Sequence, residues 1–338
     1  MKLEDESSYN AERTVRSSES ISVVIPCFNE ADVLPLLKKR LAEALQPLSL
    51  KWETIFVDDG SSDRTFEILT QMHLEDSRFK ILSLSRNFGH QAAILAGLHV
   101  AVGTVVAVMD ADLQDPPEII STCVDLSVQG YDVVYAVRRK RKEGLFKRAA
   151  YKIFYRLLDR LSDVPIPLDS GDFCLMRRRV VDVIKTMSES NLFVRGLRAW
   201  AGYRQISLEY EREARAAGET KYPFSKLFRL AADGILSFSI APLRCATYFG
   251  FSAMALSLLG IVFVVSWRLF GFSFMGHSAS ELPGWAAIVG STLFIGGVQL
   301  LILGVIGEYI GRIYNEVKRR PRWIVKNQVG FDSVENDR

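Results

Sequence analysis

Three aspartates follow a short apolar run in the stretch VMDADLQDPPE, residues 108–118. Asp110 and Asp112 stand two residues apart, so in an extended or turning chain their side chains point the same way, and Gln114 follows them. Two carboxylates and an amide oxygen are hard ligands that suit Mg²⁺ or Mn²⁺. Because two like charges this close repel each other without a cation, the stretch predicts a divalent metal site.

The end of the same stretch has a simpler explanation. Asp115 precedes Pro116 and Pro117, and proline is favoured at the first position of a helix. We therefore expect Asp115 to cap the next helix rather than to bind a ligand.

Acidic and amide side chains also follow two earlier apolar runs. Asn29 and Glu30 lie just beyond the run that ends at Pro26, and Asp58 and Asp59 follow the run WETIFV. Taken singly, each group is explained equally well by turn and cap chemistry. Taken together, they bring hydrogen-bond acceptors to the ends of two strands, an arrangement that suits a nucleobase and a ribose.

The elements that must position these residues are short β-rich runs that alternate with amphipathic stretches. This alternation predicts an α/β fold with a mostly parallel, Rossmann-like sheet. Ligands of such sheets bind at the carboxyl ends of the strands, where the polar clusters fall. The expected strands are 21–26, 52–57, 79–85, 104–109, 131–137 and 173–176, and the expected helices lie near 31–45, 64–75, 91–102, 117–129, 145–161 and 179–188.

Two later stretches, 245–267 and 285–307, contain no Asp, Glu, Lys or Arg. Each is long enough to cross a hydrocarbon core of ~30 Å as a helix. They predict transmembrane helices over 244–269 and 285–308, joined by a loop at 270–284; two buried core helices are the alternative.

Basic residues flank these stretches on one side of the expected membrane. Arg244 precedes the first stretch, and Lys318, Arg319 and Arg320 follow the second, whereas the connecting loop is poor in positive charge. The positive-inside rule then predicts a plasma-membrane protein whose catalytic domain and both termini are cytoplasmic.

The remaining segments are predicted from their polarity. Residues 1–20 are polar, lack the apolar core of a signal peptide and predict a disordered tail. Residues 225–243 predict an amphipathic helix on the bilayer surface, with packing on the globular domain as the alternative, and 309–338 predict a cytoplasmic tail. The four cysteines show no CxxC spacing and are expected to be reduced core residues. A net charge of +3 gives no argument for nucleic-acid binding.

Four motifs in order, VVIPCFNE, VDDGSSD, SRNFGH and DADLQDPPE, resemble those of the family 2 glycosyltransferases, which have the GT-A fold. With two C-terminal spans, the resemblance narrows to the polyprenyl-phosphate glycosyltransferases, which include bactoprenol glucosyltransferases and dolichyl-phosphate mannose synthase. It covers about residues 21–320 and implies a GT-A domain over 21–224. It also implies that Asp110, Asp112 and Gln114 hold the metal ion on the nucleotide diphosphate.

The resemblance further implies a nucleotide-sugar pocket. Many relatives have Tyr where this chain has Phe28, so the stacking face is kept and a hydroxyl is lost. The matching positions are Pro26, Phe28, Asn29, Glu30, Asp58, Asp59, Arg86, Asp110, Ala111 and Asp112.

Transfer of a sugar from a nucleotide to a lipid phosphate brings two anions together, so cations are needed on both sides. In the basic run 137–148, Arg138 and Arg148 are expected to hold the acceptor phosphate; a basic face attracted to anionic lipid is the alternative. In the segment 212–222, Arg215 and Lys221 match phosphate-contacting residues of the family.

The loop DSGDF, residues 169–173, falls where the family has an acidic residue on the acceptor side. Asp172 is the candidate base or orienting group, Asp169 is the alternative, and a simple loop cap is the third reading. A phosphate monoester is already ionised at pH 7, with its second pKa near ~6. We therefore expect Asp172 to orient the acceptor and to be less indispensable than Asp112.

Together these features predict an inverting, metal-dependent enzyme that moves a hexose onto undecaprenyl phosphate at the cytoplasmic membrane face. Glucose from UDP-glucose is the favoured donor. Because the family includes oligomers, the resemblance implies a homo-oligomer, with a tetramer among the forms. Enzyme alternatives are a dolichyl-phosphate mannose synthase-like use of GDP-mannose, another UDP-sugar, or a membrane polysaccharide synthase. A non-catalytic membrane anchor that binds nucleotide-sugar is the alternative from another class. His90 follows Gly89 in a strand-end loop and is expected to cap the helix that follows, with an approach to the substrate as the alternative.

Overall fold

The computed structural model describes residues 20–138, 170–187, 189, 193–210, 241–270 and 284–331. The chain divides into two compact units. Within the described residues, the first unit holds everything up to residue 210 together with 320–331, and the second holds 241–319.

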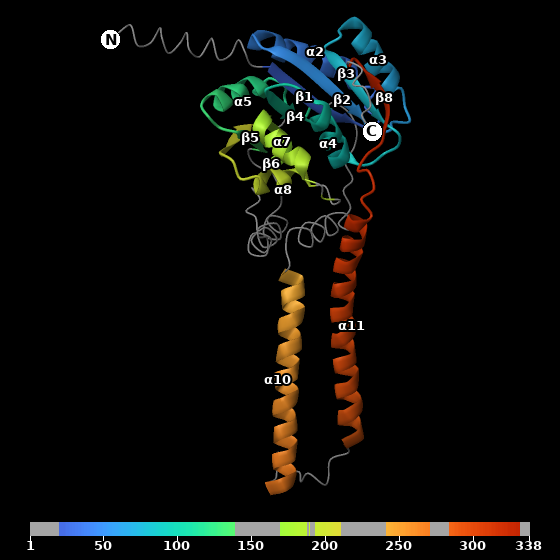
Figure 1. Ribbon diagram of the computed structural model, residues 1–338, viewed down its shortest axis with the longest axis vertical. Coiled ribbons are helices and arrows are strands. Elements are labelled where there is room, and N and C mark those ends of the chain that lie inside the picture. Colours follow the sequence, from blue (N-terminus) through green and yellow to red (C-terminus); the bar gives the residue numbers. More distant parts are fainter. Residues whose placement is uncertain are drawn as a thin grey trace, which may run out of the picture. The chain divides into compact units, whose positions relative to one another are not determined.

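The first unit is built on an eight-stranded sheet with the order β7-β5-β6-β4-β1-β2-β3-β8 (Figure 1). Strands β4, β1, β2 and β3 are parallel neighbours, whereas β6 is antiparallel to both β4 and β5, and β8 is antiparallel to β3. The mostly parallel α/β sheet predicted from the sequence is thus confirmed for its centre. The strands are β1 Ser20–Cys27, β2 Lys51–Asp58, β3 Phe79–Leu84, β4 Val105–Val108, β5 Val133–Arg138, β6 Ser170–Arg177, β7 Gln205–Tyr210 and β8 Val325–Val329.

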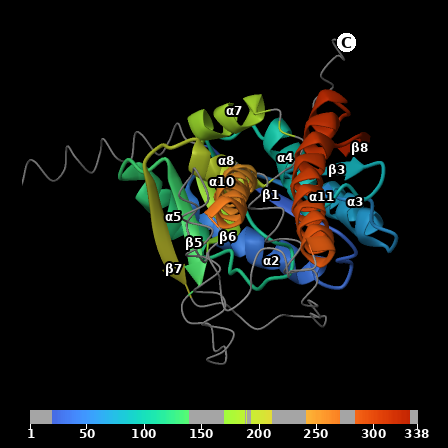
Figure 2. The same ribbon diagram turned by 90° about the horizontal axis from the view of Figure 1, so that it is seen from below.

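Helices cover both faces of this sheet, which explains why the central strands are almost continuously apolar. In β1, Ile21, Val23 and Ile25 enter the core cluster that also holds residues of α2, α3 and α5, whereas Val24 enters the cluster of α4, α7 and α8. Figure 2 shows α4 and α7 on one side of the sheet and α2 on the other. The helices are α2 Leu34–Leu45, α3 Thr65–Glu75, α4 His90–Val100, α5 Ile119–Val128, α7 Arg178–Thr186 and α8 Val194–Trp200, with a short 3₁₀ turn at Gln46–Leu48.

The structure adds three elements that the sequence pattern did not predict: α8, β7 and β8. The last of these corrects the expectation of a tail over 309–338, because Val325–Val329 pair with β3 and Ser85 N donates a hydrogen bond to Ile324 O at 2.8 Å. The strand VKNQV was missed because it lies at the sheet edge and is largely exposed, so it lacks the apolar run that marks a buried strand.

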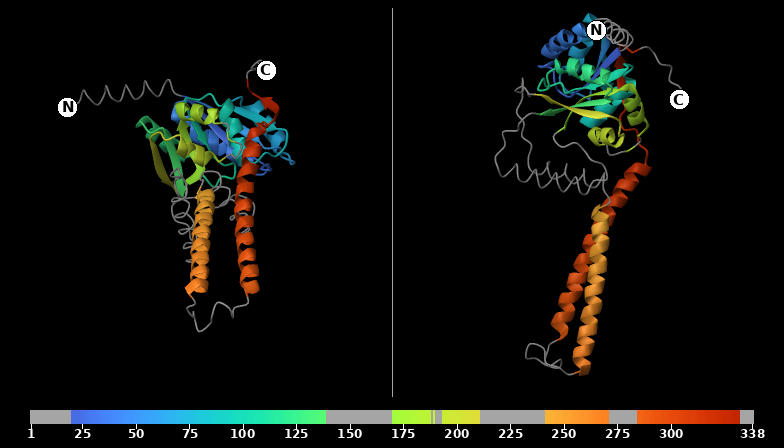
Figure 3. Two further views of the ribbon diagram at one scale, coloured as in Figure 1. Left: turned by 60° about the horizontal axis from the view of Figure 1, so that its bottom comes forward. Right: turned by 90° about the vertical axis from the view of Figure 1, so that its left-hand side faces the viewer.

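The second unit consists of α10 (Ala241–Phe270) and α11 (Gly284–Val317), which lie side by side (Figure 3). Among the described residues, one stretch, Phe294–Val317, is long and apolar enough to cross a membrane by length and composition. The apolar segment in α10, Ala246–Gly260, is shorter, so the expected pair of spans is not confirmed. Helix α11 also ends at Val317 rather than at residue 308, and Arg312 pairs with Glu308 one turn away at 3.1 Å.

The predicted amphipathic helix over 225–243 and the predicted tail over 1–20 lie outside the described residues, apart from Ser20 and residues 241–243. Three of the cysteines, Cys27, Cys123 and Cys174, are free and buried, as expected from their spacing.

Candidate active site

Strand topology brings two distant acidic residues to one edge of the sheet. Strand β6 runs antiparallel to β4, with Val108 opposite Cys174. Asp110 lies two residues after Val108 and Asp172 lies two residues before Cys174, so the register sets both acids at the carboxyl end of β4.

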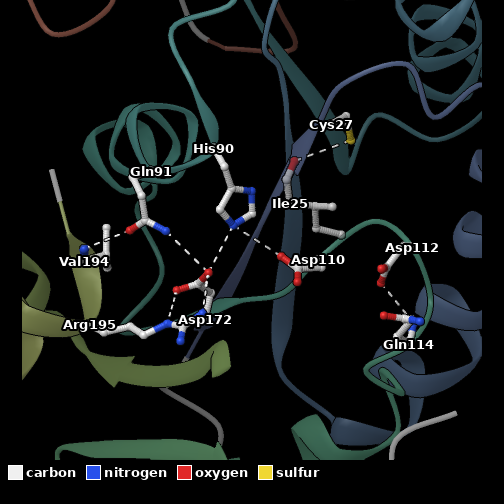
Figure 4. Close-up of polar contacts among 10 residues, drawn as sticks. All are labelled: Ile25, Cys27, His90, Gln91, Asp110, Asp112, Gln114, Asp172, Val194 and Arg195. Atoms are coloured by element: carbon white, nitrogen blue, oxygen red, sulfur yellow. Dashed lines mark hydrogen bonds and ion pairs between the residues drawn. The ribbon is translucent and has the colours of Figure 1, made fainter. Parts of the chain in front are cut away.

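A network of four charged or titratable side chains forms there (Figure 4). His90, the first residue of α4, has its Nε2 atom 3.4 Å from Asp110 Oδ1 and 3.3 Å from Asp172 Oδ2. Arg195, from the first turn of α8, forks onto Asp172, with Nε 2.7 Å from Oδ1 and Nη2 3.1 Å from Oδ2. The network therefore joins the acid after β4 to the acid at the start of β6.

Asp172 is the most heavily bonded member of this network. Besides the fork from Arg195, its Oδ2 accepts a long hydrogen bond of 3.4 Å from Gln91 Nε2, and its side chain is only 10% exposed. Burial raises the pKa of Asp172, but hydrogen bonds from His90 and Arg195 and their charges outweigh burial and hold this pKa well below its usual range. Asp172 is thus ionised at neutral pH and has little tendency to accept a proton.

Asp110 is placed very differently. Burial raises the pKa of Asp110 to about 6, His90 opposes that shift, and the charges of Asp172, Asp115 and Asp112 add to it. Its Oδ1 atom is shielded from solvent and accepts no hydrogen bond from the residues that the structure describes. Apart from its ion pair with His90 at 3.4 Å, this buried carboxylate oxygen has no hydrogen bond to the described residues, and with three other acids acting on it, it fits a site that a cation completes.

His90 links these two carboxylates rather than capping α4. The N-cap of α4 is Gly89, at φ 98°, and no side chain caps the helix. Burial lowers the pKa of His90, but its contacts with Asp172 and Asp110 outweigh burial and raise this pKa above its usual value. The expectation that His90 caps the helix is therefore wrong.

The loop after β4 turns sharply between Asp110 and Gln114. Leu113 has φ 56° although it is not glycine, and its side chain is buried. The Oδ1 atom of Asp112 accepts a hydrogen bond from Gln114 N at 3.1 Å. In Figure 4, Asp110 is directed toward His90 and Asp112 toward Gln114, so the expected parallel orientation of the two acids is not what the turn produces.

Asp110, Asp112 and Gln114 carry oxygen atoms of the type that binds a hard cation. Among the described residues, no three His, Cys, Asp or Glu side chains are placed as a metal-binding group. The predicted set differs from such a group, since it consists of two carboxylates and the amide oxygen of Gln114, with Asp110 Oδ1 as the oxygen that lacks a hydrogen bond.

The polar side chains after β1 and β2 accept hydrogen bonds within their own loops. Asp58 and Asp59 are each 2% exposed. Asp58 accepts from Ser61 N at 3.0 Å and from Ser83 Oγ at 2.9 Å, and Asn29 Oδ1 accepts from Ser62 N at 2.9 Å. These hydrogen bonds hold the loops in place, and nucleotide binding by Asp58 and Asn29 stays a prediction.

Asp59 fastens the start of α4. Its two carboxylate oxygens accept hydrogen bonds from Phe88 N at 2.7 Å and Gly89 N at 2.9 Å. Burial raises the pKa of Asp59, and these two backbone bonds oppose that shift. The position of Asp59 therefore fixes the backbone that carries His90.

The surface above these loops presents an aromatic ring and a guanidinium group. The side chain of Phe28 is 46% exposed. Arg86 lies with its guanidinium carbon 4.0 Å from the centroid of the Phe88 ring and donates a hydrogen bond to Asn87 O at 3.0 Å. The loops approach closely, since a Cβ on Gly60, at φ 70°, would lie 2.5 Å from the backbone carbon of Arg86. Among the other predicted positions, Pro26 and Ala111 are buried and Glu30 is partly exposed.

Five predicted residues lie wholly or partly outside the residues that the structure describes. Arg148, Asp169, Arg215 and Lys221 lie outside the described residues, as does the side chain of Arg138.

Sequence reasoning missed Gln91 and Arg195 and misread Asp115. Gln91 Oε1 accepts a hydrogen bond from Val194 N at 2.9 Å, so it satisfies the first N–H of α8, the helix that carries Arg195. Neither residue stands in a motif, and the pairing of α4 with α8 has no local signal. Asp115 is fully buried and accepts a hydrogen bond from Tyr210, whereas α5 begins at Ile119 without a side-chain cap, so the predicted capping role is wrong.

Comparison with known proteins decides the family. Residues 22–185 match the model described as glycosyl transferase family 2. The chain is 46% identical over 313 residues to an uncharacterized glycosyltransferase, YkcC, of Bacillus subtilis, covering 92% of this chain and 95% of that protein. The chain belongs to glycosyl transferase family 2. It is also 40% identical over 310 residues to the bactoprenol glucosyl transferase of Shigella phage SfV, covering 91% of this chain and 98% of that protein, so the resemblance predicted from the four motifs is confirmed.

Solved structures resemble this chain at lower sequence identity. Glucosyl-3-phosphoglycerate synthase from Mycobacterium tuberculosis, solved with Mn²⁺, UDP-glucose and phosphoglyceric acid, is 20% identical with a TM-score of 0.45, covering 67% of this chain and 81% of that chain. Membership of glycosyl transferase family 2 rests on the sequence relatives.

Proposed function

We propose that this family 2 glycosyltransferase moves a hexose, glucose from UDP-glucose, onto undecaprenyl phosphate with inversion at the anomeric carbon. The observation that carries the proposal is the network of Asp110, His90, Asp172 and Arg195 at the carboxyl end of β4. The name of the phage relative, a bactoprenol glucosyl transferase, supports a polyprenyl phosphate as acceptor and glucose as the sugar.

Asp110, Asp112 and Gln114 would hold Mg²⁺ or Mn²⁺ in this proposal. The metal, when bound, would offset the negative charge of the departing diphosphate. The support is chemical: three hard oxygen ligands on one short turn, of which Asp110 Oδ1 is buried without a hydrogen bond to described residues.

The donor nucleotide would lie over the loops after β1, β2 and β3. The exposed ring of Phe28 offers a stacking face, and the guanidinium group of Arg86 offers a cation on the same side. Asp58, Asp59 and Asn29 would shape this pocket through the loop hydrogen bonds that they accept, rather than through direct contacts alone.

The transfer step would be a single displacement. A phosphate oxygen of the acceptor attacks the anomeric carbon while the bond from that carbon to the diphosphate oxygen breaks, which inverts the configuration. Since the acceptor phosphate is ionised at pH 7 with its second pKa near ~6, no strong base is needed. Asp172, kept ionised by Arg195 and His90, orients the groups around it.

Cations for the acceptor phosphate would come from Arg138 and Arg148, and further cations for the diphosphate from Arg215 and Lys221.

We also propose a multi-pass plasma-membrane protein with cytoplasmic termini, assembled as a homo-oligomer. The apolar helix α11 and the arginines and lysine that follow it support the membrane part of this proposal.

The decisive experiment offers the purified full-length protein three radiolabelled donors. UDP-glucose, GDP-mannose and UDP-N-acetylglucosamine are each incubated with undecaprenyl phosphate and Mg²⁺ or Mn²⁺. We expect lipid-soluble label from UDP-glucose, and none after chelation of the metal. Label from GDP-mannose instead would replace the donor assignment, and no lipid-soluble label from any donor would overturn the enzyme function.

A further inference from the structure

A buried hydrogen bond ties the loop after β4 to the far side of the sheet. The carboxylate of Asp115, which is fully buried, accepts a hydrogen bond from the hydroxyl of Tyr210. Tyr210 is the last residue of β7 and is 5% exposed. In the sheet order, β5 and β6 separate β7 from β4, so this bond reaches across two strands.

The bond acts on the segment that carries Asp112 and Gln114. That segment is held on each side of Gln114 by a buried residue, Leu113 and Asp115. Leu113 adopts the left-handed conformation, at φ 56°, which a leucine keeps only when its surroundings hold it there. Asp112 then accepts a hydrogen bond from the backbone N–H of Gln114, so the orientation of the Asp112 side chain and the backbone that carries Gln114 depend on how the turn is anchored.

A purely structural role explains this pair poorly. A phenylalanine and an apolar residue would fill the same core without burying a carboxylate. Asp115 is a buried acid beside three candidate metal ligands, and the ring of Tyr210, which bonds it, already lies in the core cluster with Leu113 and Ala111. This arrangement points to a requirement for one orientation of the loop.

We propose that Tyr210 is a positioning residue, which fixes Asp112 and Gln114 for metal and donor binding through its hydrogen bond to Asp115. The inference rests on the proposed function, because it assumes that this loop holds a divalent cation. It goes further, because it extends the donor site to β7, a strand that carries none of the predicted ligands.

The test measures Mn²⁺ binding by the full-length Tyr210→Phe protein, by electron paramagnetic resonance, with and without UDP. The substitution removes one hydroxyl and keeps the ring. We expect an apparent Kd for Mn²⁺ about 10-fold higher than that of the wild type, as is typical when a group that orients a metal ligand is lost. The matched control is Tyr203→Phe, since the Tyr203 ring lies 5.4 Å from the guanidinium carbon of Arg179, outside the site; its Kd should be unchanged.

A second variant distinguishes a positioning role of the Tyr210–Asp115 hydrogen bond from a purely stabilising one. Asp115→Ala removes the acceptor of the Tyr210 hydroxyl, and the double variant with Tyr210→Phe should bind Mn²⁺ no more weakly than the poorer single variant, because both changes break one contact. If the wild type and Tyr210→Phe bind Mn²⁺ equally while the melting temperature of the variant falls, the bond is only structural and the inference is overturned. If the wild type binds no Mn²⁺, the metal part of the proposed function fails, and the inference fails with it.

Discussion

Acidic side chains lie at two places along the carboxyl edge of the sheet, and they are used in opposite ways. After β2, the carboxylates of Asp58 and Asp59 accept hydrogen bonds from the backbone and from a serine within the adjoining loops. After β4 and at the start of β6, Asp110 and Asp172 face His90 and Arg195 instead.

The difference shows that position at a strand end does not decide the role of an acid. An acid whose oxygens bond backbone N–H groups builds the loop, because those bonds hold the chain in place. An acid whose neighbours are other charged side chains is costly to bury unless a ligand uses it. The first region should therefore respond to mutation in stability, and the second in activity.

The strongest contrast is expected from Asp110→Asn and Asp112→Ala. Each should lower kcat/KM for sugar transfer by about 10³-fold, the scale for the loss of a group that stabilises developing charge. The melting temperature should fall little, since neither carboxylate holds a distant loop. Transfer assays with Mg²⁺ and thermal unfolding of the same samples test this. Asp125→Asn, at an exposed position on α5, is the control, and full activity of Asp112→Ala would remove the metal assignment.

A smaller loss of activity is expected from Arg195→Ala, which removes the fork on Asp172. A residue that orients another functional side chain in this way typically contributes about 10–100-fold to activity. Arg195→Lys should recover part of the loss, because it keeps the charge and loses the two-pronged geometry. Arg78→Ala, which breaks a similar fork on Asp76 before the start of β3, should leave kcat unchanged; an equal loss in both variants would contradict the distinction.

Asp59→Asn should give the reverse result. The amide would offer an N–H to a backbone N–H, so one of the bonds to Phe88 and Gly89 is lost at a cost of about 1–3 kcal/mol in the free energy of unfolding. Chemical denaturation should show this loss, whereas kcat per folded molecule should stay within about twofold. A variant with unchanged stability and abolished donor binding would mean that Asp59 contacts the nucleotide directly.

The smallest expected effect concerns pH. The pKa of Asp172 is lowered in the folded protein. The contribution of Asp172 to the stability of the fold is therefore complete above the pKa of an unfolded aspartate, near ~4, and is lost only as the pH falls toward the pKa in the folded protein. Asp172 itself does not titrate between pH 5 and 8, but its charge raises the pKa of His90 and of Asp110, so Asp172→Asn should lower the rate and shift the ionisations of these two groups to lower pH without removing one from the pH–rate profile. Loss of an ionisation from that profile would identify Asp172 as a base after all.

The central helices and strands could be predicted from the sequence because the spacing of apolar and polar residues determines them. Strands β1 to β5 and helices α2 to α5 lie close to their predicted bounds, since runs covered on both faces carry a strong apolar signal. The motif around Asp110 and Asp112 likewise drew attention to the strand end at which Asp110, His90 and Asp172 meet.

The contacts between distant segments could not be predicted. Arg195 stands in no motif, and it reaches Asp172 only because Gln91 satisfies the start of α8. Asp58 and Asp110 look alike in the sequence, as acids directly after apolar runs, and differ only in the partners that the fold brings to them. Asp115 likewise reads as a helix cap until β7 supplies Tyr210.

Strand β8 changes how the helical part of the chain should be understood. The polypeptide leaves the first unit after β7, forms α10 and α11, and returns to pair with β3. In topological terms the two helices are an insertion within the domain rather than an extension at its end. A helix-free version of the first unit therefore needs a linker that joins the segment after β7 to residue 320, because a stop codon before α10 would also remove an edge strand of the sheet.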